Sequence, residues 1–235
     1  MAEEEIYASV RVVGGGVSPD EITERLNVAP SRAWRKDEPF VDVAGKLRER
    51  YNGLWLYDAK GLEFKSPVEH VRHVMDMMKG RIRRREDGGW GDAQVDLCLW
   101  IAAPEMVWSI AGQDIGQMIE EGYDGINVSF VGLDDGLPEN GNSGGEGAAK
   151  AQISLCSTES GGIVCSVTAE GGLAECIEKV LAEFVQKLKA AADLPPSRIS
   201  IEWIVSHGAL YIGREDMKLF RDIGCCQLDF MFRNA

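Results

Sequence analysis

The chain has 235 residues, of which 45% are hydrophobic and 27% are charged, and its formal net charge at pH 7 is -13. These proportions are ordinary for a globular protein, so we expect a packed core. The negative charge argues against binding to nucleic-acid phosphates or to anionic membranes, and it is compatible with a basic protein partner.

The first predicted elements are a strand and a helix. Residues 6–13 alternate between apolar and polar side chains, which is the pattern of a half-buried strand. After a run of glycines, Ser18 and Glu21 form a capping box with Pro19 at the first helical position. The glycines lack the spacing of a phosphate-binding loop, and Asp20 would repel an anion at this helix end, so we predict a plain turn.

The stretch after this helix is the most distinctive part of the sequence. It reads L-N-V-A-P-S-R-A-W-R-K-D-E-P over residues 26–39, between an S-P-D-E-I-T helix start and a later G-L-W-L segment. These motifs resemble a bacterial family known as domain of unknown function 4279. The positions that carry the resemblance are Leu26, Val28, Pro30, Ser31, Trp34, Arg35 and Lys36.

The resemblance covers residues 5–132, and the second half of the chain looks like a degenerate copy. It implies a bacterial, cytosolic protein with a ferredoxin-like fold. Because the family has no established activity, the resemblance assigns no catalytic residues.

One candidate binding site lies within this stretch. A hydroxyl and two cations would hold a carboxylate or a phosphate beside an apolar wall of two tryptophans. The alternative interpretation is structural: Trp34 packs on the sheet, and the basic pair bonds nearby acids such as Asp37 and Glu38. The candidate residues are Ser31, Trp34, Arg35, Lys36 and Trp55.

The next segment contains a second helix with a basic end. Residues 40–52 read as a loop, residues 54–58 as a short strand, and Ser66 with Pro67 starts a helix with a buried apolar stripe. Basic residues favour a helix C-terminus, so we predict a solvated end, with an anion site as the alternative. The basic residues are Lys79, Arg81, Arg83, Arg84 and Arg85.

Two histidines of this helix, His70 and His73, have the spacing that lets both face one metal ion. They lie off the apolar stripe, on the side expected to face water, and the H-E-x-x-H order is absent. We therefore predict no metal site.

The remaining elements occur in the same order in the two halves of the chain. From Leu54 and again from Ile163 the pattern reads strand, helix, strand, strand, helix, strand, and each half has one preceding strand, at Ile6 and at Ile153. This is the order of a ferredoxin-like sandwich. In a standard ferredoxin-like sheet the preceding strand would lie at an edge, whereas a hairpin turning at Ser160 and Gly161 would bring Cys156 and Cys165 to face each other; the sequence is compatible with both positions.

We therefore predict the α+β class and two tandem ferredoxin-like (βαββαβ) units. Each unit would be an antiparallel sheet with helices on one face and one extra N-terminal strand. The first would span residues 1–132 and the second residues 149–235. Residues 133–148 are rich in glycine and acidic side chains, which predicts a flexible linker.

The sequence also indicates a compartment. Residues 1–5 lack the basic and apolar regions of a secretory signal, and the longest apolar run, residues 97–103, is far shorter than the about 20 residues that span a bilayer. We expect a cytoplasmic protein. The cysteines form no C-x-x-C pair, so we predict free structural thiols.

Three classes of function remain open. The first is a non-enzymatic protein-interaction module, such as an immunity protein. The second is a sensor that binds a small anionic ligand at residues 31–36. The third is an enzyme that uses His207 near Asp216, or Cys225 and Cys226. No catalytic, metal or cofactor motif stands out, so the interaction module is predicted, and open sheet edges are compatible with a homodimer.

Overall fold

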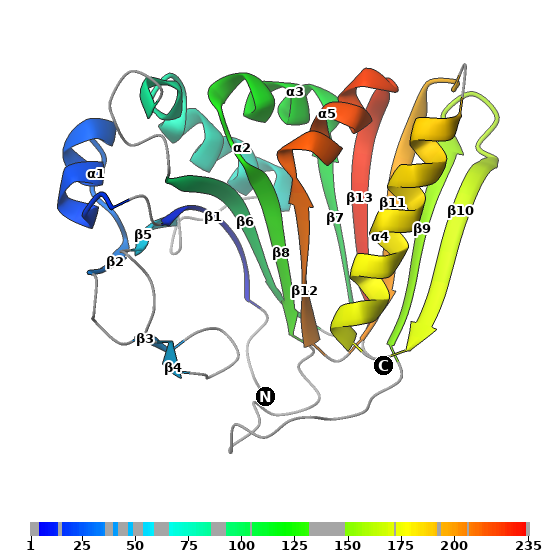
Figure 1. Cartoon of the computed structure of the whole chain (residues 1–235), viewed down its shortest axis with the longest axis horizontal. Helices are drawn as coiled ribbons and strands as arrows, with labels where there is room; N and C mark the ends of the chain where they lie inside the picture. The colour runs from blue at the N-terminus through cyan, green and yellow to red at the C-terminus, as the bar shows by residue number, and fades with distance from the viewer. Residues whose placement is uncertain are drawn as a thin grey trace.

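The computed structural model contains two main sheets with helices packed against them, which confirms the α+β class (Figure 1). Within the described part of the chain, no helix is long and apolar enough to cross a membrane. The described residues are 5–13, 16–35, 40–41, 47–48, 54–58, 66–85, 93–103, 105–131, 149–171, 173–191, 194–205 and 207–233.

The first sheet has the strand order β12-β8-β6-β1-β5-β2. β1 is antiparallel to both β5 and β6, β6 is parallel to β8, and β12 from the second half of the chain is antiparallel to β8. The strands are β1 (Glu5–Val13), β2 (Arg32–Trp34), β5 (Leu54–Asp58), β6 (Gln94–Ala102), β8 (Gly125–Val131) and β12 (His207–Gly213).

The second sheet has the strand order β10-β9-β11-β13-β7. Its strands are β7 (Glu105–Ala111), β9 (Ala149–Ser157), β10 (Ile163–Gly171), β11 (Ser197–Ile204) and β13 (Cys225–Arg233). Two short strands, β3 (Phe40–Val41) and β4 (Leu47–Arg48), pair within the stretch that was predicted to be a loop.

The helices pack on these sheets through their apolar stripes. α2 lies on β1 and also contacts β7, whereas α4 lies on β9 and β10 and also contacts β12. The predicted capping box of α1 is present, and Ser66 caps α2 by accepting the Glu69 N–H. The helices are α1 (Pro19–Leu26), α2 (Pro67–Met78), the 3-10 helix η1 (Ile82–Arg85), α3 (Gly112–Glu121), α4 (Leu173–Ala190) and α5 (Arg214–Asp222).

The two halves of the chain exchange one strand each. β5-β1-β6-β8 in the first sheet and β10-β9-β11-β13 in the second have the same order and the same strand directions. The first sheet is completed by β12 of the second half, and the second sheet is completed by β7 of the first half. Each half therefore supplies an edge strand to the sheet of the other.

This pairing differs from the predicted ferredoxin-like arrangement. β6 has β1 and β8 as its neighbours, so no edge of β6 is left for β7. The preceding strands β1 and β9 lie inside their sheets and not at an edge, and β9 pairs with β10 in the hairpin that was the alternative. Alternation of apolar residues predicts that a segment is a strand, but it carries no information about which strand lies beside it.

The sheets share one hydrophobic core. The rings of Phe130 on β8 and Phe232 on β13 stack with centroids 5.0 Å apart, and the Trp203 ring lies 5.8 Å from Phe232. A Cβ atom at Gly208 of β12 would lie 2.6 Å from the Trp203 ring, so glycine permits the close approach of the exchanged strand. The predicted linker, residues 133–148, lies outside the described residues.

Candidate functional site

Ser31, the first of the predicted site residues, joins the start of β2 to β5. Its N–H donates to the Leu56 carbonyl at 2.8 Å, and its hydroxyl donates to the Asp58 carbonyl at 2.9 Å. The Asp58 N–H in turn donates to the Ser31 hydroxyl oxygen at 2.9 Å. These bonds give Ser31 a structural task in the sheet.

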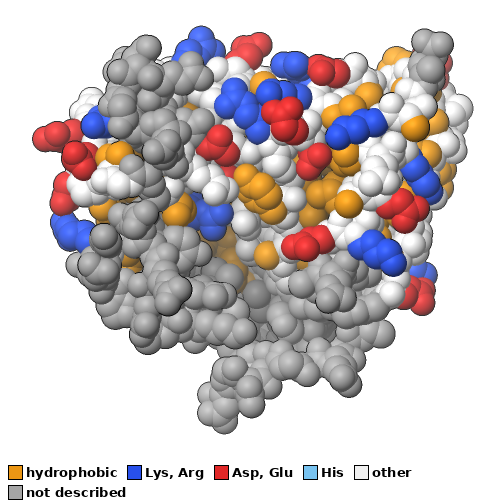
Figure 2. Space-filling model, viewed as in Figure 1, with side chains coloured by type: hydrophobic (Ala, Val, Ile, Leu, Met, Phe, Trp, Pro, Cys, Tyr) orange, Lys and Arg blue, Asp and Glu red, His pale blue; other side chains and the backbone are white. Residues whose placement is uncertain are grey.

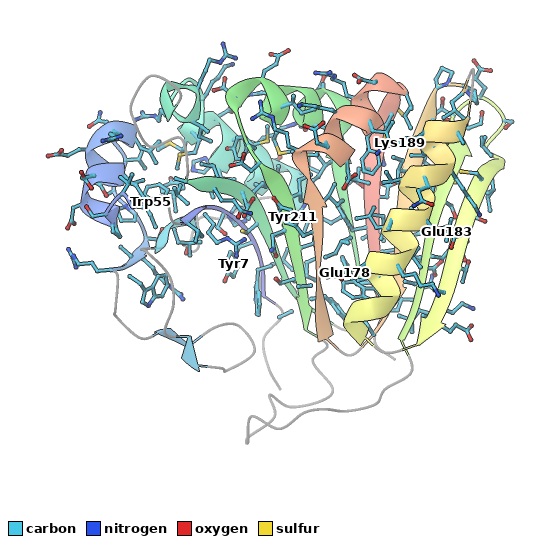
Figure 3. All side chains as sticks on the ribbon, viewed as in Figure 1. Tyr7, Trp55, Glu178, Glu183, Lys189 and Tyr211 are labelled. Carbon is cyan, nitrogen blue, oxygen red and sulfur yellow. The ribbon has the colours of Figure 1, made fainter. Side chains whose placement is uncertain are left out.

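The two predicted tryptophans lie on opposite faces of the first sheet. Trp55 pairs with Ala33, and its neighbour Leu54 pairs with Trp34. Trp55 is fully buried beside α1, where its indole N–H donates to the Thr23 hydroxyl at 3.1 Å (Figure 3). Trp34 is half-buried. The structure therefore does not bring the two rings together as one wall.

Arg35, the first residue of the predicted basic pair, directly follows β2. Arg35 forms an ion pair with Asp20 of α1, with contacts of 3.0 Å and 3.3 Å between guanidinium nitrogens and carboxylate oxygens. Both side chains are exposed, so water screens the pair. Lys36 and the expected acidic partners Asp37 and Glu38 lie outside the described residues.

A larger polar and aromatic surface lies on the first sheet. Alternate residues of β1 and β6, such as Val10 and Leu97, are buried on the side of α2. The residues between them point to the opposite side, which we call the outer face. In Figure 1, β8 and β12 lie in front of β7 and β13, so this face is turned toward the viewer, and Figure 2 shows hydrophobic side chains there among charged ones.

Strand pairing arranges the outer face in rows that cross the sheet. One row contains Tyr7, Trp100, Ser129 and Ala209; the next contains Asp58, Ser9, Cys98, Asn127 and Tyr211; the third contains Arg32, Leu56, Arg11, Asp96 and Gly125. Residues from both halves of the chain thus share one surface (Figure 3).

Asp96 lies at the centre of a hydrogen-bonded cluster on this face. Its carboxylate, which is fully buried, accepts from the Arg11 guanidinium at 2.7 Å, from the Gln94 amide at 3.0 Å and from the Tyr211 hydroxyl at 3.3 Å. A buried charge is tolerated when it is paired and hydrogen-bonded in this way. The cluster connects β1, β6 and the exchanged strand β12.

Gly125 of β8 lets Tyr211 reach this carboxylate. A Cβ atom at position 125 would lie 2.5 Å from the Tyr211 ring, so the ring crosses β8 where no side chain is present. Burial and the nearby Asp96 carboxylate raise the pKa of Tyr211 to about 12. The hydroxyl therefore stays protonated at neutral pH and acts as a donor.

The two cysteines suggested as nucleophiles, Cys225 and Cys226, differ in their exposure. Burial raises the pKa of Cys98 to about 12 and that of Cys225 to about 11, so both thiols are protonated at neutral pH. Cys226 is exposed. Burial also raises the pKa of Asp216, and the side chain of its suggested partner His207 lies outside the described residues.

The expectation that both histidines of α2 face water was wrong for His70, which is only 5% exposed. Burial lowers the pKa of His70, and the nearby His73 lowers it further. Across the residues that the structure describes, no group of three or more His, Cys, Asp and Glu side chains is arranged to hold a metal ion.

Sequence reasoning missed Arg11, Asp96 and Tyr211. Each occupies a polar position of an alternating strand, which is a signal that the side chain faces away from the core. That signal does not show that the three strands meet, because their contact depends on the pairing of β1 with β6 and on the strand exchange.

Comparison with known proteins gave one match. No curated protein sequence and no solved structure matches the chain. Residues 4–85 match the model of a family described as domain of unknown function (DUF4279). The matched segment runs from β1 to η1 and includes Trp34 and Arg35. The first part of this chain is therefore similar to this family, as the motifs around Trp34 predicted, and the match ends at residue 85, short of the predicted residue 132.

Proposed function

We propose that this protein is a non-enzymatic interaction module that binds a protein partner on the outer face of the first sheet. The observation that supports this is the residue composition of that face. Tyrosine, tryptophan and arginine are the residue types that contribute most binding energy in protein interfaces. The face presents Tyr7, Trp34, Trp100, Tyr211, Arg11 and Arg32.

The aromatic side chains of this face are held on paired strands. Tyr7 and Trp100 are direct neighbours on β1 and β6, with ring centroids 6.3 Å apart. Tyr211 is 41% exposed although it is anchored to Asp96 through its hydroxyl. Rings that are already oriented lose little conformational entropy when a partner covers them, which favours binding.

Charge supports a basic partner. The net charge of -13 would attract a basic protein over long range and increase the rate of association. On the face itself the Arg11 charge is balanced by Asp96 at 2.7 Å. The contact would therefore depend on the aromatic side chains, and the remaining negative charge would act at a distance.

The alternative proposal is a small anionic ligand at residues 31–36, and it has less support. The Ser31 hydroxyl is used in the pairing of β2 with β5. Asp20 already neutralises Arg35, so a ligand would have to displace that carboxylate. Trp55 lies on the other face of the sheet.

The experiment that tests the interaction proposal compares two arginine substitutions in affinity capture from cell lysate. Ala209 is exposed on the outer face, and Thr168 is exposed on β10 of the second sheet. Ala209→Arg places a bulky cation on the proposed surface, whereas Thr168→Arg makes the same charge change elsewhere. We expect a stoichiometric partner to be captured by the natural protein and by Thr168→Arg, and to be lost with Ala209→Arg.

Equal capture by both variants would contradict the proposal, provided that their melting temperatures match that of the natural protein. If capture of the partner were lost only in the double variant Arg35→Ala with Lys36→Ala, the result would indicate that the partner binds at residues 31–36 and not on the outer face.

A further inference from the structure

A depression of about 690 Å³ lies over α3, between the end of α2 and the end of α5. We call it the α3 groove. Its floor includes Gly112 and Gly116, and a Cβ atom at Gly116 would have no atom within 4 Å, so the groove is open there. Its walls carry Lys79 at the end of α2, Arg83 of η1 and Arg221 of α5.

The cations of the groove come from elements far apart in the sequence, on a protein whose net charge is -13. Figure 2 shows Lys and Arg side chains near α3 and α5, with Asp and Glu side chains among them. Arg83 is positioned by its Nε–H, which donates to the Glu120 carbonyl at 3.1 Å. Arg221 bonds the adjacent Asp222, and Lys79 Nζ has no hydrogen bond or ion pair to any described residue.

Two acidic side chains, Glu120 and Glu121, also line the groove, and an anion would have to displace Asp222 from Arg221. Glu121 is buried, and its carboxylate accepts the Gly80 N–H at 2.7 Å, so it serves to hold the turn that follows α2. Glu120 is exposed, so water and salt screen its charge.

The floor of the groove also contains a donor that lacks an acceptor. The amide nitrogen of Gln117 is buried, and within the described part of the chain nothing accepts its hydrogens. Buried donors without acceptors are destabilising and are rare in folded proteins. The Gln117 side chain lines the groove, so a rotation that turns its amide toward a bound anion would supply the missing acceptor.

We propose that the α3 groove binds a small polyanion that carries two or more phosphate or carboxylate groups. Several cations around one hollow suit several charged groups, since each would form charge-assisted hydrogen bonds. The volume of the groove is within the range of small-molecule sites. This gives a binding role to the basic end of α2, and the site is separate from the outer face of the first sheet.

The test is titration calorimetry of the full-length protein with pyrophosphate and with citrate at low ionic strength. Lys79→Gln with Arg221→Gln removes two groove cations without removing a buried contact. Lys150→Gln with Arg198→Gln removes the same charge from exposed positions on the second sheet. We expect the natural protein and the control to bind at least one probe, and the groove variant to bind it about tenfold or more weakly.

Two results would overturn the proposal: no binding of either probe to the natural protein, or equal weakening in the groove variant and the control, which would indicate an effect of net charge alone. A Gln117→Met variant gives a second readout. We expect it to bind the probe more weakly while its melting temperature is unchanged or higher, because the unpaired donor is gone. Unchanged affinity would contradict the role given to Gln117.

Discussion

Asp96 is the buried charge around which the outer face is organised. Replacing it with alanine would leave the Arg11 guanidinium and the Tyr211 hydroxyl without their acceptor, while Arg11 stays only 27% exposed. Breaking one side of a buried ion pair costs about 3–5 kcal/mol. We therefore expect Asp96→Ala to lower the free energy of unfolding by about that amount in urea denaturation.

The matched control is Asp222→Ala, which also removes an aspartate bound to an arginine at 2.8 Å, but at an exposed position. Water screens this pair, so little change in stability is expected. If the two variants were equally stable, the cluster around Asp96 would not be a structural centre of the face.

Thiol reactivity tests the burial of the cysteines. Cys226 is exposed, whereas the pKa of Cys98 is raised to about 12 and that of Cys225 to about 11. At pH 8 the fraction of each of these two thiols present as thiolate would therefore be lower than that of an ordinary cysteine by roughly a hundredfold or more. Iodoacetamide labelling followed by mass spectrometry should modify Cys226 first. Equally fast modification of Cys98 would show that its side chain is accessible.

At the scale of single residues, the sequence predicted the face of the sheet to which a side chain points better than it predicted the residue that the side chain contacts. Alternation in β1 and β6 correctly placed Val10 and Leu97 in the core and Arg11 and Asp96 on the other face. It did not predict that Arg11 and Asp96 bond, because the two residues are 85 positions apart in the sequence. The candidate ligand site placed Trp34 and Trp55 in one wall, since the pairing of β2 with β5 was not foreseen.

Helix α3 contains two glycines, Gly112 and Gly116, whose surroundings differ. A Cβ atom at Gly112 would lie 2.2 Å from the Cys225 carbonyl oxygen, a backbone atom of β13 that has no room to move. A Cβ atom added at Gly116 would have no neighbouring atom within 4 Å. We expect Gly116→Ala to raise the free energy of unfolding by about 1 kcal/mol, because alanine favours the helix.

Gly112→Ala should instead lower stability, because α3 must move away from the start of β13. Thermal unfolding of the two variants provides the measurement. Gain of stability in both would mean that α3 does not pack against β13 as closely as described.

At the scale of elements, the predicted order of strands and helices agrees with the structure from β5 onward, whereas the short strands β2, β3 and β4 were not predicted. Helix starts were readable from local chemistry: Ser18 and Ser66 both cap helices through the N–H three residues on. The sequence did not predict which strands lie beside one another in the sheets. The segment 105–111 is a strand as its apolar residues predicted, but it lies beside β13 and not beside β6, because pairing is decided by contacts between distant segments.

The whole molecule is held together by the exchange of β7 and β12. Each of these strands completes the sheet of the other half, and both halves contribute to one core. If a protease site is inserted in residues 133–148 and cut, we expect the two fragments to co-elute in size-exclusion chromatography and to separate only in denaturant. Fragments that part in native buffer would show that the halves fold as independent units.

The exchange also explains why the outer face contains residues from both halves, such as Tyr7 and Tyr211. Hydroxyl-radical footprinting of the protein, free and bound to its captured partner, tests the proposed function most directly, because it reports the exposure of individual side chains. The account predicts that oxidation of Tyr7 and Tyr211 falls on binding, while oxidation of Met231 on the second sheet is unchanged. Protection of Met231 with no change at Tyr211 would contradict it.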